Sequence, residues 1–224
     1  MSFRKIKGLI FDLDGTLLDT LDDITTAGNN VLARLGMEGI SKDLYRVFVG
    51  EGTSELFRKI LAYRNSLNDE DKVKLCVKLM REEYSKVCLN STRPYEGIPE
   101  LLDYLQSRGM RMAVLSNKSH EFTQKLIKEL LGKWSFVEVL GVRNDEDRKP
   151  NPKLAMEISK KMGLNPEEIC FVGDSPTDIE TAKNAGMLSI GVTWGFKSVS
   201  EIEQASPDYI FNSPYEIIKF FKDC

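Results

Sequence analysis

Short apolar runs of strand length recur along the chain, and helical patterns separate them. The runs lie at residues 9–11, 112–115, 136–140, 169–172, 188–192 and 209–211. Strands that are apolar along nearly their whole length are typical of a parallel sheet covered by helices on both faces. The pattern predicts an α/β fold with a Rossmann-like parallel sheet, in which the last run lies at an edge.

The long interval between the first two runs contains no convincing strand and shows helical periods instead. Apolar residues step by three and four at Leu17, Leu21, Ile24, Gly28, Val31 and Leu35, and again at Val73, Val77, Met80, Tyr84 and Val87. Such spacing places apolar side chains on one face of a helix. We expect residues 18–90 to form an inserted helical domain, and residues 1–17 and 91–224 to form the α/β core.

Composition and charge narrow the possible partners. The chain is 42% apolar and 29% charged, with a formal net charge of −3. This composition is typical of a soluble globular protein, and a mildly acidic chain has no electrostatic reason to bind nucleic acid or an anionic membrane. No apolar run is long enough to span a bilayer. Monomer and homodimer both stay open.

The cysteines and the N-terminal residues indicate in which cellular compartment the protein is expected. The four cysteines form no CxxC pair, and the chain has one histidine, which argues against a zinc site. The first residues lack the apolar stretch and cleavage site of a secretory signal. A reducing, cytoplasmic environment is therefore expected.

Two acidic residues follow the first predicted strand directly, in the segment Phe11-Asp12-Leu13-Asp14-Gly15-Thr16. In extended chain, residues two apart face the same way, so Asp12 and Asp14 project together beyond the carboxyl end of the sheet. Ligands of open α/β sheets bind at that end. A DxD segment alone is also common as a helix-capping turn.

A second apolar strand also ends in acids, in the segment Val172-Gly173-Asp174-Ser175-Pro176-Thr177-Asp178. Ser175 suits a helix N-cap and Pro176 the first helical position. Helix capping does not explain why two strands should end in carboxylates. Such a cluster is unfavourable without a cation, and ligands that are all oxygen suit Mg²⁺.

Two further segments supply groups that could bind an anion. Ser116 and Asn117 follow the second strand, where the next helix offers backbone N–H groups. Lys149 stands just before a helix that begins with proline, in Arg148-Lys149-Pro150-Asn151-Pro152. Taken singly, Ser116-Asn117 is more typical of a turn and Lys149 of a solvated surface residue.

Together and in this order, the four segments resemble the four signatures of the haloacid dehalogenase superfamily. The resemblance covers essentially the whole chain, including the position of the helical insert. Within the superfamily the chain is most similar to the phosphoglycolate phosphatase group. That similarity rests on the segments Asp14–Thr20, Val49–Gly52, Arg148–Pro152 and Gly191–Gly195.

The resemblance implies a Mg²⁺-dependent phosphatase and a role for each core residue. Asp12 is the expected nucleophile and Asp14 the general acid and base. The expected metal ligands are Asp12, Asp14, through its backbone carbonyl, and Asp174, with Asp178 near the metal or Lys149. The residues expected to hold the phosphoryl group or the rest of the substrate are Thr16, Ser116, Asn117 and Lys149.

The resemblance also implies that the insert is a cap that closes over the site and selects the substrate. Gly50 and Gly52 would let the cap backbone approach the substrate, and Arg46 is the favoured partner for a substrate carboxylate. A small phosphorylated metabolite is expected as substrate, with 2-phosphoglycolate as the best candidate. Sugar phosphates, nucleoside monophosphates and pyrophosphate stay open.

Two other activities and one non-enzymatic role are alternatives on the same fold. A dehalogenase has no leaving alkoxide to protonate, so Asp14 argues for phosphate chemistry. Phosphosugar mutases such as β-phosphoglucomutase have a histidine early in the cap, whereas His120, the sole histidine, lies outside residues 18–90. A phosphate-binding module without activity would be expected to have lost a carboxylate or the lysine.

Overall fold

The core of the protein is one parallel sheet. The computed structural model describes residues 6–64 and 69–223. Six strands are ordered β5-β4-β1-β6-β7-β8, and every neighbouring pair is parallel. They span β1 Gly8–Phe11, β4 Arg111–Ser119, β5 Phe136–Val142, β6 Ile169–Gly173, β7 Leu188–Val192 and β8 Tyr209–Phe211. The predicted α/β fold is confirmed, with the last strand at an edge.

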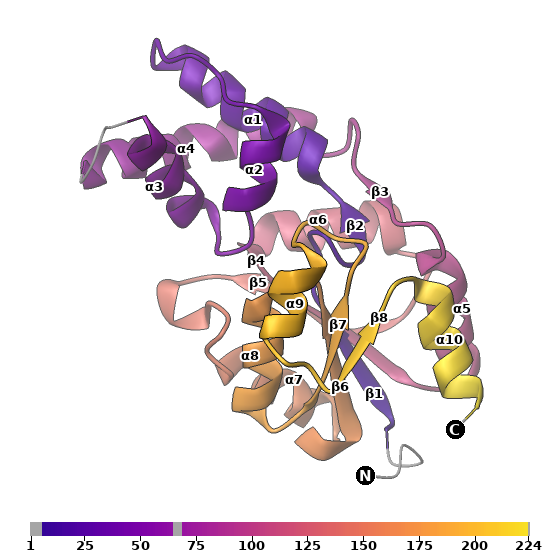
Figure 1. Ribbon diagram of the computed structural model, residues 1–224. Helices are drawn as coiled ribbons and strands as arrows, with labels where there is room; N and C mark the ends of the chain where they lie inside the picture. The colour runs from indigo at the N-terminus through magenta and orange to yellow at the C-terminus, as the bar shows by residue number, and fades with distance from the viewer. Residues whose placement is uncertain (1–5, 65–68, 224) are drawn as a thin grey trace.

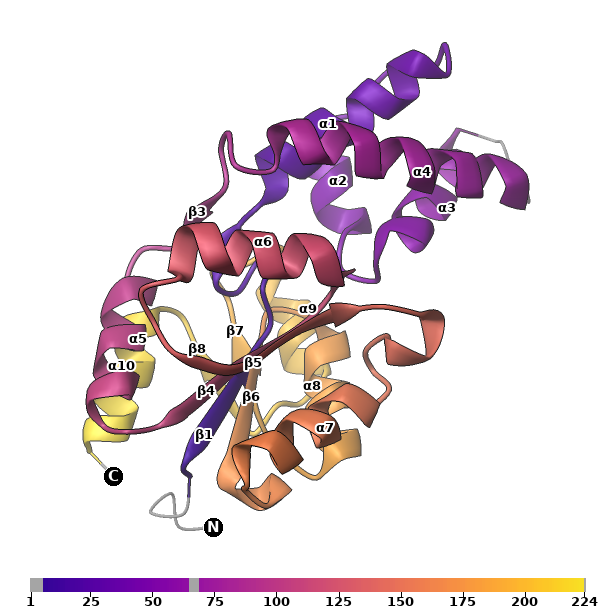
Figure 2. The same ribbon diagram turned by 180° about the vertical axis from the view of Figure 1, so that it is seen from behind.

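Helices cover both faces of this sheet (Figures 1 and 2). One face packs against α5 (Ile98–Ser107), α6 (His120–Leu131) and α10 (Pro214–Lys222). The other packs against α7 (Lys153–Met162) and α8 (Pro176–Ala185), beside which lies α9 (Val199–Gln204). The pleat of β1 sends Leu9 and Phe11 to the first face and Ile10 to the second, which is why its apolar run is continuous.

A group of four helices lies beyond the carboxyl ends of the strands (Figure 1). They are α1 (Leu21–Arg34), α2 (Lys42–Phe48), α3 (Thr53–Tyr63) and α4 (Glu70–Val87). The two helical periods of the sequence correspond to α1 and α4, which pack against each other. Tyr45 of α2 and Phe57 of α3 are fully buried among them. Burying one such side chain contributes about 1.5–3 kcal/mol.

The chain enters and leaves this helical group through two very short strands. Leu18–Asp19 (β2) pairs antiparallel with Arg93–Pro94 (β3). Next to this ribbon, the buried Asp23 carboxylate accepts hydrogen bonds from the backbone N–H groups of Ser91 and Thr92 and from the Thr92 hydroxyl. The sequence pattern predicted no strand here, because two residues are too few to show an alternation.

The second strand of the core is longer than predicted. β4 continues through Ser116 and Asn117 to Ser119, with irregular pairing to β5 beyond Leu115, and α6 begins at His120. The expectation that a helix N-terminus directly follows Asn117 is therefore wrong. Ser116 and Asn117 taken singly suggested a turn, but Ser119 pairs with Val142 and keeps the segment extended.

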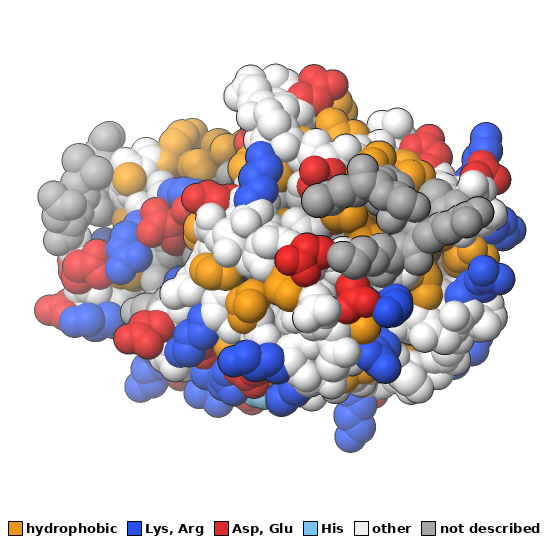
Figure 3. All heavy atoms as spheres, turned by 90° about the horizontal axis from the view of Figure 1, so that it is seen from below, with side chains coloured by type: hydrophobic (Ala, Val, Ile, Leu, Met, Phe, Trp, Pro, Cys, Tyr) orange, Lys and Arg blue, Asp and Glu red, His pale blue; other side chains and the backbone are white. Residues whose placement is uncertain are grey.

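The described residues on the face turned away from the four-helix group carry charges of both signs (Figure 3). Acidic and basic side chains are interspersed there with small apolar areas (Figure 3). Among the described residues, no helix is both long and apolar enough to cross a membrane.

Candidate active site

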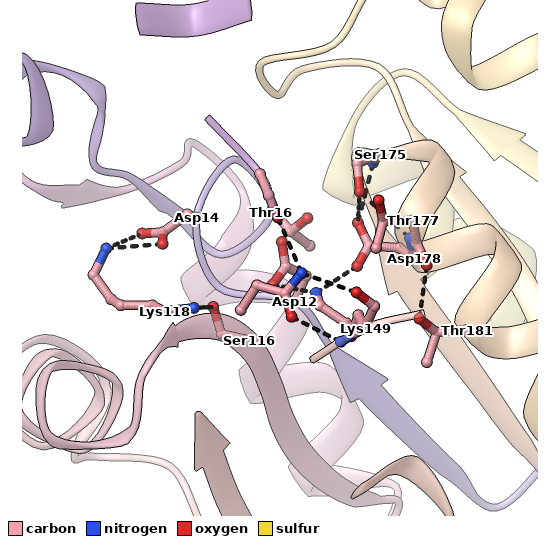
Figure 4. Close-up of polar contacts among 12 residues, drawn as sticks. Asp12, Asp14, Thr16, Ser116, Lys118, Lys149, Ser175, Thr177, Asp178 and Thr181 are labelled. Atoms are coloured by element: carbon pink, nitrogen blue, oxygen red, sulfur yellow. Dashed lines mark hydrogen bonds and ion pairs between the residues drawn. The ribbon is translucent and has the colours of Figure 1, made fainter. Parts of the chain in front are cut away.

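A buried lysine joins two acidic residues at the carboxyl end of the sheet (Figure 4). Asp12 directly follows β1, and Asp178 lies in the first turn of α8. Lys149 Nζ donates to Asp12 Oδ1 at 2.7 Å and to Asp178 Oδ1 at 2.5 Å. The side chains of Lys149 and Asp178 are 3% and 0% exposed, so this contact is shielded from solvent. Lys149, which taken singly is typical of a solvated surface residue, is buried at the centre of this cluster.

Three carboxylates crowd together around this lysine. Oxygen atoms of Asp12, Asp174 and Asp178 all lie within 4.8 Å of one another. Burial raises the pKa of Asp12 well above its usual value, and the charges of Asp178 and Asp174 add to the increase while Lys149 opposes it. Burial and the Asp178 charge raise the pKa of Asp174 to about 7. The cluster therefore has more negative charge than Lys149 alone neutralises.

Asp174 is fixed by contacts from two other segments. Thr16 Oγ1 donates to Asp174 Oδ1 at 3.2 Å, and the Phe196 N–H donates to Oδ2 at 2.7 Å. The backbone of Gly15 has φ +87°, and a Cβ at this position would lie 2.3 Å from Asp174 Oδ2. Glycine is required here both by the left-handed turn and by the close approach. Thr16, expected to bind substrate, is fully buried, and the residues that line the cavity do not include it.

Asp14 is paired with a lysine that the sequence reading missed. Lys118 Nζ lies 2.8 Å from both carboxylate oxygens of Asp14 (Figure 4). Thr20 Oγ1 donates to Asp14 Oδ1 at 2.7 Å. The side chains of Lys118 and Asp14 are 9% and 13% exposed. Burial alone would lower the pKa of Lys118, but Asp14 and Tyr84 raise it, so the side chain is an ammonium. The side chain of Asp14 thus points away from the group formed by the other three acids.

The side chain of Asn117 forms hydrogen bonds with the backbone of Lys149 in the core and of Gly50 in the helical group. Its side-chain oxygen accepts from the Lys149 N–H at 2.8 Å, and its Nδ2 donates to the carbonyl oxygens of Lys149 and Gly50. Ser116 is buried, and its hydroxyl accepts from the Lys118 N–H at 3.2 Å. Asn117 therefore positions Lys149 through its side chain.

Asp12, Asp14, Asp174 and Lys118 border a cavity of about 70 Å³ between the sheet and the four-helix group. Asp12, Asp14, Ser116, Asn117, Lys118 and Asp174 line its polar end. Ile24, Leu56, Met80, Tyr84 and Phe196 are among the residues of its apolar wall. Small-molecule sites commonly have about 300–1,000 Å³. This cavity therefore suits a compact ligand.

The cap-side residues expected to meet the substrate have different positions. Gly50 and Gly52 line the cavity, with φ +129° and +91°. Arg46 is exposed on α2 and is not among the residues that line the cavity. Its position four residues before Gly50 suggested proximity, but the intervening helical turn directs it outward. The cations that line the cavity in the described part of the chain are Lys118 and Lys197.

Comparisons with known proteins agree with this arrangement. The family model for haloacid dehalogenase-like hydrolases matches residues 9–192. A phosphoglycolate phosphatase of Vibrio parahaemolyticus is 31% identical over 222 residues, covering 98% of this chain and 97% of the relative. One from Aquifex aeolicus is 31% identical over 211 residues, covering 94% of each chain. A crystal structure from Lactobacillus delbrueckii, provisionally assigned as a phosphoglycolate phosphatase, has a TM-score of 0.90 at 30% identity, covering 96% of this chain and 98% of its own.

The chain belongs to the haloacid dehalogenase-like hydrolases. Within that family it is a phosphatase, similar over nearly its whole length to phosphoglycolate phosphatases. A small phosphorylated substrate follows from this class.

Proposed function

We propose that the protein hydrolyses 2-phosphoglycolate with the help of Mg²⁺, through a phosphate ester on Asp12. The observation that carries the proposal is the buried group of Asp12, Asp174 and Asp178 around Lys149. Three carboxylates and one ammonium suit a site that receives a divalent cation and a phosphoryl group together. We further propose that residues 18–90 act as a cap and that the protein is cytoplasmic.

The residues present fit a magnesium ion. Burial is the main cause of the raised pKa values of Asp12 and Asp174, and the charges of the neighbouring acids add to it, so a bound cation would favour their ionised forms. Asp12 and Asp174 would hold the ion through their carboxylates and Asp14 through its backbone carbonyl, with Asp178 binding Lys149 rather than the ion. When bound there, Mg²⁺ supplies positive charge next to the nucleophile and the phosphoryl oxygens.

The chain's own residues account for the chemical steps of this proposal. An Asp12 oxygen forms a bond to phosphorus as the bond from phosphorus to the leaving oxygen breaks. Asp14 gives its proton to the leaving alkoxide, then takes a proton from the water that cleaves the aspartyl-phosphate. Lys149, Ser116 and Asn117 stabilise the charge on the transferring phosphoryl group. The four-helix group excludes bulk water from both steps.

The size of the cavity supports a short substrate. The polar end accommodates a phosphoryl group, and the volume of about 70 Å³ leaves little room for a leaving group beyond it. Glycolate has two carbons, whereas a sugar or nucleoside would need the helical group to open. This argument favours 2-phosphoglycolate over the sugar phosphates and nucleotides.

Asp12→Asn tests the reaction class. Because the amide cannot attack phosphorus, we expect release of phosphate from 2-phosphoglycolate to fall by at least about a thousandfold, while the protein stays folded. The measurement is turnover with Mg²⁺ and in excess EDTA, and EDTA should abolish activity of the unaltered protein. A variant that kept most of its turnover would exclude Asp12 as nucleophile.

A further inference from the structure

We propose that Lys118 and Tyr84 form a binding site for the carboxylate of the leaving group. This inference rests on the proposed phosphatase function and assigns the part of the site that selects the substrate. Lys118 comes from β4 in the core and Tyr84 from α4 in the helical group. The two side chains meet in the wall of the same cavity.

The Tyr84 hydroxyl is a buried donor that lacks a partner. Tyr84 is 3% exposed, and its hydroxyl proton has no acceptor among the described residues, because the neighbouring Lys118 ammonium can only donate. Burial raises the pKa of this phenol, and the Lys118 ammonium only partly offsets the increase, so the hydroxyl keeps its proton. A buried hydroxyl proton without an acceptor destabilises the protein. A substrate oxygen in the cavity would supply that acceptor.

Lys118 has capacity for a second anion. Its ammonium carries three N–H donors, and the pair with Asp14 uses at most two of them. Nζ also lies 4.7 Å from the centre of the Tyr84 ring, which fixes it over the aromatic face. An anion that approached the Tyr84 hydroxyl would therefore also meet the Lys118 ammonium.

The position beside Asp14 places this pair on the leaving-group side of the cavity. Asp14 is the proposed acid for the leaving oxygen, and Lys118 contacts both of its carboxylate oxygens. Ile24, Leu56 and Met80 complete the wall with apolar groups. Because these side chains exclude water, a charged hydrogen bond here contributes more than it would on the surface. The geometry thus fits a leaving group with an acidic end one or two carbons from the phosphate.

Tyr84→Phe is the sharper variant, since it removes one oxygen and keeps the ring under Lys118. The measurement is kcat/KM for 2-phosphoglycolate and for ethyl phosphate, which has the same carbon skeleton without the carboxylate. We expect the ratio of the two values to fall by about tenfold or more in Tyr84→Phe and further in Lys118→Met. Lys118→Arg should restore part of the ratio because it keeps the charge.

Tyr45→Phe and Lys128→Met are the matched controls. Tyr45 is buried in the same helical group but does not line the cavity, and Lys128 is exposed on α6. Both should leave the ratio as it is in the unaltered protein. An unchanged ratio in Tyr84→Phe and Lys118→Met would overturn the inference. Pyrophosphate turnover that fell more than 2-phosphoglycolate turnover would also overturn it, since the bound anion would then be a phosphate.

A binding measurement separates this inference from the proposed function. In Asp12→Asn, calorimetry with 2-phosphoglycolate and Mg²⁺ reports affinity without turnover, and adding Tyr84→Phe should weaken that affinity by about tenfold. Equal affinity with and without the hydroxyl would overturn the carboxylate site. If the unaltered protein released no phosphate from any of these substrates, the proposed function would fail, whatever the binding result.

Discussion

Asp174 is the residue at which protons and a cation compete most directly. Its pKa of about 7 arises from burial and from the nearby Asp178 charge, and the Phe196 N–H and Thr16 hydroxyl only partly counter them. Below pH 7 the carboxyl is mostly protonated in the metal-free protein. Because a cation binds the ionised form, a proton must leave before Mg²⁺ can bind.

We therefore predict that Mg²⁺ binding weakens by at least about tenfold between pH 8 and pH 6. The sign follows from the raised pKa: ionised Asp174 dominates above pH 7 and is lost below it. Titration calorimetry at both pH values measures the effect, and buffers of different ionisation enthalpy count the released protons. Equal affinity at pH 6 and pH 8 would contradict the prediction.

Some residues of the site could be identified from the sequence alone, and others could not. Asp12, Asp14 and Asp174 could be selected because each follows an apolar strand, and strand ends meet at one edge of a parallel sheet. Lys118 gave no such sign, since its burial depends on Tyr84, which lies on a helix 34 positions earlier in the chain. Arg46 was favoured by its distance along the chain alone, and α2 leaves it exposed.

At the scale of elements, the ribbon of β2 and β3 depends on a single buried carboxylate. The Asp23 carboxylate accepts hydrogen bonds from Ser91 and Thr92 at the point where the chain returns to the core. Without that carboxylate, two backbone N–H groups and one hydroxyl lose their partner. The ribbon is too short for its own pairing to hold it.

Asp23→Ala should lower the free energy of unfolding by at least about 2 kcal/mol, because each buried donor left without a partner costs about 1–3 kcal/mol. Asp22→Ala is the matched control. Asp22 is 54% exposed and pairs with Lys42 at the surface, so its loss should cost less than about 1 kcal/mol. Denaturant unfolding of both variants measures the difference, and equal costs would exclude the role assigned to Asp23.

Whole strands were the most predictable elements. The predicted runs 9–11, 169–172, 188–192 and 209–211 match β1, β6, β7 and β8 to within one residue, because all four are nearly all apolar, although β8, at the edge, is only half-buried. The end of β4 could not be predicted, since its last residues are polar and their extended shape depends on pairing with β5. The short helices α2 and α3 have too few turns for a distinct period.

At the scale of the whole molecule, three hydrogen bonds join the helical group to the core next to the cavity. Asn117 Nδ2 donates to the Gly50 carbonyl, Arg148 Nη1 to the Glu51 carbonyl and Lys197 Nζ to the Val47 carbonyl. All three acceptors are backbone groups of one segment, residues 47–51. The position of that segment therefore decides whether the cavity is closed.

Gly52→Ala should disturb this closed arrangement. Gly52 has φ +91° and ψ 169°, a conformation almost restricted to glycine, and its strain with alanine would be about 1–3 kcal/mol. A Cβ there would also lie 2.0 Å from Arg148 Nη1 and 3.3 Å from the Asn117 carbonyl oxygen. We expect kcat/KM to fall by about tenfold for 2-phosphoglycolate and ethyl phosphate alike, in contrast to Tyr84→Phe.

Gly36→Ala is the control for this variant. Gly36 also has a positive φ, of +69°, but no atom lies within 4 Å of the position that a Cβ would take. It should reduce stability without changing kcat/KM for either substrate. A loss confined to one substrate in Gly52→Ala would mean that Gly52 contacts the leaving group and does not control closure.

The order of the strands has a consequence for the protein while it is being synthesised. β1 lies in the middle of the sheet, but its partners β4 and β6 begin at Arg111 and Ile169. At about 5–20 residues per second, roughly 8–30 s separate translation of β1 from translation of β6. During that time the ribosome has already released the sequence of α1–α4. The nascent chain must therefore keep an apolar strand from the middle of its sheet without its full set of partners while the four helices are already free to fold.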